Sequence, residues 1–251
     1  FFYKIFILIH GKIDGVIKLE EDERIKVKKT SFDNKNYKIY IIDEGRLYTD
    51  RINDTAVILD NKIIEGPSFQ LRYVDNLIKN SISHDNTVFK KGTARIKNKI
   101  KGSVLSLLTG GAGNENYFHW LFDVLPRLEI ISQAIDLKKI DYYLFPNLKK
   151  NFQIQTLNEL KIPFNKRLSS ETCRHIQAEN LILSDHPYVL ENNPTKEIQE
   201  IPLWISNWLK KSFIKEVKNL KKISKRFYID RQDSYTSKQN LRVIINENEL
   251  K

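Results

Sequence analysis

The sequence predicts an α/β protein in which a β-rich region, residues 1–100, is followed by alternating strands and helices. Hydrophobic residues make up 41% of the 251 positions and aromatic residues 11%, which supplies a buried core and excludes a disordered chain. Short apolar runs between polar turns fill the first hundred residues, whereas strand and helix patterns alternate from Lys101 onward. Alternation of this kind predicts a mostly parallel sheet with helices on both faces.

The first hundred residues contain apolar runs of strand length. Two of them are residues 37–42 and 55–59, next to polar turn segments at residues 33–36 and 43–45. The opening run, residues 1–9, is short, and we expect a buried strand or the remnant of an element cut by a missing start. Because no His, Asp or Glu cluster with catalytic spacing occurs in this region, we expect it to support or cover a site.

The elements expected after Lys101 follow in a regular order. They are a strand at residues 102–108, a glycine-rich turn at 109–113, a helix from about Asn116, a strand at 142–145, a helix at 152–160, a strand at 181–183, a long helix at 198–220 and a strand at 226–229. The long helix is expected because its apolar residues recur at helical spacing. Pro126 is expected to break or kink the helix that begins near Asn116.

Charge and cysteine content narrow the function classes. Lys and Arg number 42 against 31 Asp and Glu, and the net charge of +11 makes phosphates, nucleic acid or anionic lipid plausible partners. No stretch approaches the roughly 20 apolar residues needed to span a bilayer. The single cysteine, Cys173, excludes an internal disulfide framework and fits a reducing compartment, so we expect a cytoplasmic protein.

Metal and nucleic-acid chemistry have no motif in this sequence. The five histidines show no H-E-x-x-H spacing and Cys173 has no cysteine partner, so a divalent metal is not indicated. No helix-turn-helix, zinc or RNP-type pattern accompanies the positive charge, so we do not expect nucleic acid to bind.

The basic segment at residues 210–226 has two interpretations. It is either a solvated helix face or a peripheral contact with the inner face of an anionic membrane. Asp185 and His186, before Pro187, are interpreted as turn residues; lining of the cleft is the alternative.

The stretch at residues 110–128 is the most informative for function. Its glycines, Gly111 and Gly113 among them, follow a strand and precede a helix, where backbone N–H groups can face a ligand; a flexible connector is the alternative. His119 and Asp123 are four residues apart and share one helix face, so the carboxylate can orient the imidazole as a general base. The nearby helix N-terminus favours the neutral imidazole. A histidine packed beside Trp120 for structural reasons is the alternative.

A second candidate site lies near the end of the sequence. The strand at residues 226–229 brings Arg231 to its carboxyl end, and Arg242 follows after a polar loop. The planar guanidinium group binds phosphate oxygens in pairs, so these two arginines suit a diphosphate. Surface salt bridges are the alternative.

Both stretches together resemble glycosyltransferase family 61. The family motif Asn-Tyr-x-His-Trp-x-x-(Asp/Glu)-x-x-Pro-Arg matches residues 116–127, NYFHWLFDVLPR. The later motif matches YIDR at residues 228–231 and RVIINE at residues 242–247, with Asp230 where the family commonly has Ser. The resemblance covers roughly residues 105–251.

The resemblance implies a GT-B-type enzyme with two Rossmann-like halves, here residues 101–222 on the acceptor side and residues 223–251 as the beginning of the donor-binding half. It implies inverting transfer of a sugar from a nucleotide-sugar donor to a glycan or lipid-linked acceptor, as in capsular polysaccharide biosynthesis, with no further cofactor. The implied roles are base for His119, its orienting carboxylate for Asp123, donor-phosphate binding for Arg231 and Arg242, and cleft lining for Gly111, Gly113, Asn116, Tyr117, Asn246 and Glu247.

One departure from the family affects the expected activity. The family continues beyond the Asn-Glu motif to a His-Gly-Ala-Gly-type loop, which this sequence lacks, and the chain has no Met at all. We therefore expect a fragment of a longer enzyme that is inactive by itself. A carbohydrate- or nucleotide-sugar-binding module that has lost catalysis is the alternative.

Overall fold

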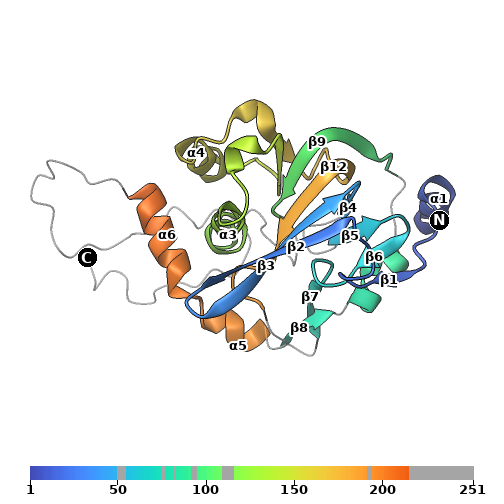
Figure 1. Cartoon of the computed structure of the whole chain (residues 1–251), viewed down its shortest axis with the longest axis horizontal. Coiled ribbons are helices and arrows are strands. Elements are labelled where there is room, and N and C mark those ends of the chain that lie inside the picture. The colour runs from blue at the N-terminus through green and yellow to red at the C-terminus, as the bar shows by residue number, and fades with distance from the viewer. Residues whose placement is uncertain are drawn as a thin grey trace, which may run out of the picture. The chain divides into compact units, whose positions relative to one another are not determined.

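The computed structural model describes residues 1–49, 55–74, 77–81, 83–91, 95–108, 116–190 and 194–214, all within one compact unit that spans residues 1–214 (Figure 1). Several predictions concern other positions. The following lie outside the described residues: the glycine-rich turn with Gly111 and Gly113, the strand at 226–229, Arg231, Arg242, Asn246, Glu247, and most of the basic segment at 210–226.

Within the described ranges, ten strands form one mixed sheet, and β7 and β8 form a separate hairpin. The strands are β1 (Gly15–Ile17), β2 (Ile25–Phe32), β3 (Lys35–Asp43), β4 (Arg46–Thr49), β5 (Thr55–Leu59), β6 (Lys62–Ile64), β7 (Gln70–Val74), β8 (Leu77–Ser81), β9 (Asn98–Ser106), β10 (Tyr142–Phe145), β11 (Arg167–Ser169) and β12 (His175–Ser184). The prediction of a β-rich first region is confirmed. Strands from both sides of residue 100 share the large sheet, and the domain boundaries expected from the sequence stay predictions.

The described helices are short, and several single helical turns lie between the other elements. They are α1 (Phe2–His10), α2 (Tyr117–His119), α3 (Pro126–Ser132), α4 (Asn151–Glu159), α5 (Pro194–Gln199) and α6 (Leu203–Phe213), with the 3-10 turns η1 (Ser83–Asp85), η2 (Thr87–Phe89), η5 (Leu137–Lys139) and η6 (Phe164–Lys166) and the π-helical turn η4 (Trp120–Val124). In the part of the chain that the structure describes, no helix has the length and apolar character needed to cross a membrane.

The sheet is mixed, with a block of parallel strands in its second part and a short parallel pair, β1 and β6, in its first. Strands β12, β9, β10 and β11 lie in this order and are all parallel, as the sequence predicts. Strands β3 and β4 join β12 in antiparallel orientation and carry β2 and β5 with them. The sheet as a whole is therefore mixed, because the hairpins of the first region extend it.

The prediction of helices on both faces is wrong for the described residues. Side chains alternate along β9, so Val104 and Leu105 point to opposite faces of the sheet. Leu105 joins a core cluster that includes residues of α3, α4 and α6, which Figure 1 shows on one side of the sheet. Val104 joins a cluster built from strand residues and Leu108, without a helix. The strands of the first region supply apolar side chains to this face, among them Ile42, Leu47 and Val57.

The apolar run at residues 1–9 forms helix α1, so the expected strand is wrong. A short apolar run has no periodicity that separates helix from strand, and packing decides. Phe6 is fully buried in a third core cluster with Tyr48 and Ile58, whereas Leu8, on another side of the helix, is 86% exposed. Gly11 ends the helix with a positive φ of 82°, a conformation that glycine adopts without a steric penalty.

The predicted long helix at residues 198–220 is interrupted. Helix α5 ends at Gln199 and α6 begins at Leu203, because Pro202 has no N–H to continue the first helix. Asp33, in the turn between β2 and β3, accepts a hydrogen bond from the Trp204 N–H at 2.8 Å and so caps α6. The Trp204 ring stacks on Phe32 at 4.5 Å. This contact joins α6 to the β2–β3 hairpin.

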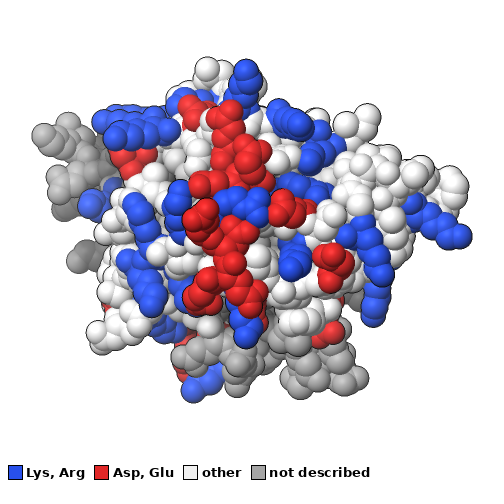
Figure 2. Space-filling model, turned by 45° about the vertical axis from the view of Figure 1, so that its right-hand side comes forward, with Lys and Arg blue, Asp and Glu red and all other residues white. Residues whose placement is uncertain are grey.

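The positive charge of the chain is not uniform over the surface. Figure 2 shows a band of acidic side chains across one face, with basic side chains on both sides of it. Arg24 pairs with Asp22 and Asp60 at 2.7 Å each, and Lys26 pairs with Asp43 at 2.8 Å. Surface pairs of this kind contribute little to stability. The acidic band separates the basic side chains of this face into two areas.

Candidate active site

The candidate site lies where two neighbouring parallel strands end. Strand β9 ends at Ser106 and β12 ends at Ser184, and the two strands pair directly. The chain after β9 leads to the helical segment with His119, and the chain after β12 turns at Pro187. Ligands of open α/β sheets bind beyond the carboxyl ends of such strands. The sheet topology therefore places the sequence motif at the edge where a ligand site is expected.

The helical segment begins at a side-chain cap. Asn116 has an extended backbone, and its Oδ1 accepts hydrogen bonds from the N–H groups of Phe118 at 2.8 Å and His119 at 3.4 Å. This is the N-cap arrangement that asparagine favours. The cap fixes the start of the helix three residues before His119.

Replacement of Asn116 by alanine is expected to lower the free energy of unfolding by about 1 kcal/mol, because two N–H groups lose their acceptor. Urea unfolding monitored by circular dichroism measures the change. Asn116→Asp retains an acceptor oxygen and serves as the matched control. An alanine variant as stable as the aspartate variant would contradict the capping role.

A π-helical turn separates α2 from α3. The Leu125 N–H donates to the Trp120 carbonyl oxygen five residues earlier at 3.1 Å, and Pro126, which lacks an N–H, opens α3. Pro126 was expected to break or kink the helix. In the structure it follows the π-helical turn, and the helical path continues in α3. Single π-turns of this kind often occur at functional sites.

His119 and Asp123 form a hydrogen-bonded pair, as their spacing predicts. His119 Nδ1 lies 2.7 Å from Asp123 Oδ2, and the two side chains are 41% and 5% exposed. A carboxylate only accepts hydrogen bonds, so Nδ1 carries the proton and Nε2 holds the free lone pair. Asp123 thus orients the imidazole, and Nε2 is the nitrogen that remains free to accept a proton.

The pKa of His119 is shifted upward from its ordinary value. Asp123 raises the pKa of His119 through the hydrogen bond, and partial burial acts in the opposite direction. The effect expected from the helix N-terminus, which favours the neutral imidazole, is outweighed, because a carboxylate in direct contact acts more strongly than a partial charge one turn away. A raised pKa makes Nε2 a stronger proton acceptor.

Tyr188 holds the second oxygen of Asp123. Its hydroxyl group donates to Asp123 Oδ1, and its ring is buried. Burial and the Asp123 carboxylate raise the pKa of Tyr188, so the phenol stays protonated and remains a donor at neutral pH. Both carboxylate oxygens are thus occupied, one by the histidine and one by a residue 65 positions away.

Arg127 ties the π-turn to the end of β12. It is fully buried, and its Nε donates to the Asp123 carbonyl oxygen at 2.8 Å and its Nη1 to the Ser184 carbonyl oxygen at 3.4 Å. Burial lowers the pKa of Arg127 to about 10, which leaves the guanidinium charged at neutral pH, and Asp123 and Asp185 oppose the shift. The side chain is therefore a buried cation that fixes the backbone under the His119–Asp123 pair.

His186 closes the turn after β12. Its Nδ1 accepts from the N–H groups of Tyr188 at 3.3 Å and Val189 at 3.1 Å, as its interpretation as a turn residue implies. The proton then sits on Nε2, which has no hydrogen-bond partner among the described residues. Burial lowers the pKa of His186 to about 3, so the ring is neutral at physiological pH.

The buried neutral His186 makes stability depend on pH. Below the ordinary pKa of 6.5 the unfolded chain binds a proton that the folded state does not, so stability falls as pH falls from 6.5 toward 3. His186→Asn keeps an acceptor but does not titrate, and it should reduce the stability loss between pH 7 and pH 5 by about 2 kcal/mol. Urea unfolding at the two pH values tests this, with the exposed His84→Asn as control. An unchanged loss in His186→Asn would contradict the assignment.

The other predicted site residues within the described ranges lie close to this pair along the chain. Tyr117 is 56% exposed, and its ring packs edge-on against Phe152 at 5.0 Å. Trp120 points into the core, where its Nε1 donates to Thr156 Oγ1 at 2.9 Å.

No group of three or more His, Cys, Asp or Glu side chains in the described part of the chain is arranged to hold a metal ion.

Sequence reasoning missed three residues of the site. Arg127 stands inside the motif but received no role. Its position directly after Pro126, which begins a helix, was the local signal for it. Tyr188 had no local signal, because its partner Asp123 is 65 positions away. His186 was interpreted chiefly as a turn residue, and its burial against Tyr188, with ring centres 4.6 Å apart, depends on tertiary packing.

The fold and the site define an α/β protein with a His–carboxylate pair at the carboxyl ends of parallel strands, an arrangement suited to proton abstraction from a substrate. The family model described as Glycosyltransferase 61 matches residues 117–251, more than half of the chain. The chain belongs to this family, which implies glycosyltransferase activity with a sugar donor and a glycan acceptor in general. No curated protein and no solved structure shows a significant match.

Proposed function

We propose that the protein transfers a sugar from a nucleotide-sugar donor to a hydroxyl group of a glycan or lipid-linked acceptor, with inversion at the anomeric carbon, in polysaccharide biosynthesis. The observation that carries this proposal is the pair of His119 and Asp123. The buried carboxylate is held on its other oxygen by Tyr188, and the imidazole is partly exposed at the ligand-binding edge of the sheet.

The proposed reaction is a single displacement. Nε2 of His119 takes the proton of the acceptor hydroxyl while its oxygen forms the bond to the anomeric carbon. The bond between that carbon and the diphosphate oxygen breaks, and the nucleoside diphosphate leaves with the electron pair. Asp123 stabilises the imidazolium that forms, and the hydrogen bond from Tyr188 keeps the carboxylate in place.

The donor side of this mechanism rests on residues outside the described ranges. We assign binding of the donor diphosphate to Arg231 and Arg242, since paired guanidinium groups neutralise a leaving diphosphate without a metal ion. Gly111, Gly113, Asn246 and Glu247 would line the donor side of a GT-B-like cleft. These assignments follow the resemblance to the family, whereas the proposed cytoplasmic location follows from the single cysteine.

Asn116 and Tyr117 belong to the proposed acceptor side. Asn116 is fixed by its capping bonds, and the exposed Tyr117 ring precedes His119 by two residues. Aromatic rings that remain exposed beside a site offer a flat apolar surface for a sugar ring. This placement supports an acceptor position from which a hydroxyl group reaches Nε2.

A transfer assay with the full-length gene product tests the proposal. Radiolabelled nucleotide sugars, with glycan and lipid-linked acceptors, are incubated with and without EDTA, and the product anomer is determined by NMR. We expect a product of inverted configuration and no loss with EDTA. Donor binding without hydrolysis or transfer would contradict the proposal and favour the binding-module alternative.

A further inference from the structure

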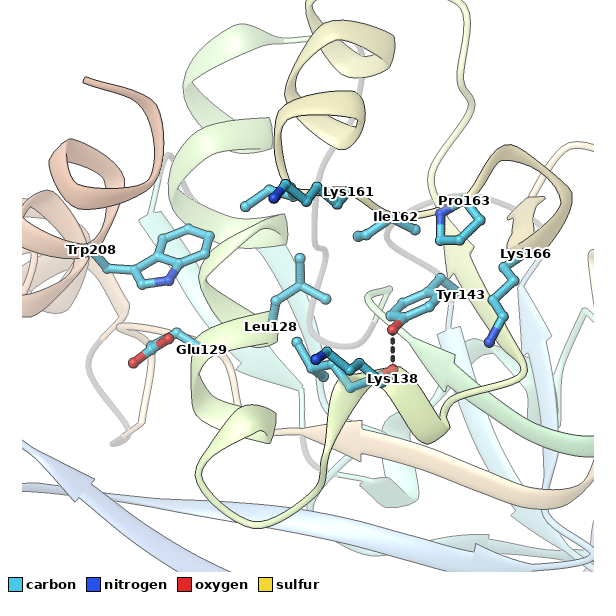
Figure 3. Close-up of a pocket in the computed structure, with 11 residues that line it drawn as sticks. Leu128, Glu129, Lys138, Tyr143, Lys161, Ile162, Pro163, Lys166 and Trp208 are labelled. Carbon is cyan, nitrogen blue, oxygen red and sulfur yellow. Dashed lines mark hydrogen bonds between the residues drawn. The ribbon is translucent and has the colours of Figure 1, made fainter. Parts of the chain in front are cut away.

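A cavity lies on the helix-covered side of the sheet (Figure 3). It has a volume of about 470 Å³ and is bounded by α3, η5, β10, the end of α4 and α6. Its walls are mostly apolar and include Leu128, Tyr143 and Trp208. The volume falls within the roughly 300–1,000 Å³ typical of small-molecule pockets.

This cavity is distinct from the candidate active site. Its lining residues Leu137 and Lys138, in η5, precede β10, and Ile162 and Pro163 precede β11, so the cavity lies toward the amino ends of these parallel strands. His119 follows the carboxyl end of β9, which runs parallel to β10. The two sites therefore lie at opposite ends of the strands, and a ligand in the cavity has its own binding determinants.

Three lysines and one glutamate line the cavity, which gives it a charge of 3 − 1 = +2. Lys166 donates to the Ile140 carbonyl oxygen at 2.6 Å, whereas Lys138 and Lys161 form no side-chain hydrogen bond or ion pair with the described residues. Glu129 is engaged by the Gln133 amide at 3.1 Å. The two unpaired ammonium groups are therefore available to an anion.

Lys161 occupies a position that usually carries glycine. Its φ is +57°, and its N–H donates to the Asn158 carbonyl oxygen at 3.0 Å at the end of α4. A left-handed residue after a helix is most often glycine, because other side chains are strained there. The helix dipole favours a cation at this end. In Figure 3, Lys161 and Lys138 lie on opposite sides of Leu128, so the two cations flank the apolar wall.

We propose that this cavity binds an amphipathic anion: an aliphatic chain that ends in a phosphate or carboxylate group. The chain lies against Leu128, Tyr143 and Trp208 and is stabilised by burial of its methylene groups. The head group binds Lys138 and Lys161 through charge-assisted hydrogen bonds. The ligand is a free amphiphile that binds inside the cavity. The proposal is independent of the sugar-transfer reaction.

Isothermal titration calorimetry with three probes tests the proposal. Decyl phosphate carries both parts of the ligand, 1-decanol carries only the chain and inorganic phosphate only the head group. We expect decyl phosphate to bind at least about tenfold more tightly than either partial probe. Equal affinity for decanol and decyl phosphate, or no binding of any of the three probes, would overturn the proposal.

Matched variants separate this cavity from nonspecific binding. The double variant Lys138→Gln with Lys161→Gln should weaken decyl phosphate about tenfold and leave decanol unchanged. Lys139→Gln removes an exposed charge next to Lys138 that does not line the cavity, and it should leave both affinities unchanged. Leu160→Trp, which fills the cavity, should abolish binding of both probes with an unchanged circular dichroism spectrum. Equal losses in the Lys139 variant and the double variant would overturn the proposal.

Discussion

Replacement of His119 by alanine is expected to lower kcat for sugar transfer by about 10²–10⁴-fold, the usual contribution of a positioned general base. The imidazole is the group that Asp123 orients and makes more basic, and its removal leaves the acceptor hydroxyl without a proton acceptor. The donor KM should change little, because the base does not bind the nucleotide. Initial rates of the full-length gene product, with a nucleotide-sugar donor and varied acceptor, measure the effect.

Two controls make this result specific. His84→Ala, in the exposed turn η1, should leave kcat unchanged. Asp123→Asn removes the carboxylate that raises the pKa of His119, so the acid limb of the pH–rate profile should move to lower pH, because activity is lost when the imidazole becomes protonated. An intact rate in His119→Ala would refute its assignment as the base.

Replacement of Arg127 by methionine is expected to lower the free energy of unfolding by about 3–5 kcal/mol. Methionine keeps the apolar part of the side chain but leaves the carbonyl oxygens of Asp123 and Ser184 without these donors. It also removes the buried cation that opposes the carboxylates of Asp123 and Asp185. Chemical denaturation at neutral pH measures the loss.

The same substitution at a surface arginine provides the comparison. Arg24 pairs with Asp22 and Asp60 in a partly exposed position, and Arg24→Met should lower the free energy of unfolding by only about 0–1 kcal/mol. Arg127→Lys keeps the positive charge without the guanidinium fork and should lie between the two methionine variants. Equal losses at the two arginines would contradict the structural role assigned to Arg127.

Local patterns in the sequence predicted several elements closely. The strands at residues 55–59 and 142–145 have the bounds expected from their apolar runs, because turn residues flank both. The pairing of His119 with Asp123 follows from a four-residue separation on a helical turn, even though that turn is π-helical. Such predictions hold because covalent geometry and helical pitch fix the neighbours of a residue within one turn.

Other features have no local cause. The opening apolar run is a helix because Phe6 packs against β-strand residues such as Tyr48, a contact that the run itself does not encode. The predicted helix cover of the second sheet face is replaced by strands of the first region. The break between α5 and α6 had a visible signal in Pro202, but the cap of α6 by Asp33 joins positions 171 residues apart.

The sequence by itself determined the α/β character, the family motif and the His119–Asp123 pair. Only the tertiary structure decided that Tyr188, Arg127 and the end of β12 support that pair. Their positions depend on the register of β12 against β9, which shifts at a bulge between Ala178 and Asn180. A register shift of one residue would turn every following side chain of β12 to the other face. Packing of the whole sheet selects that register, and no segment of the sequence specifies it alone.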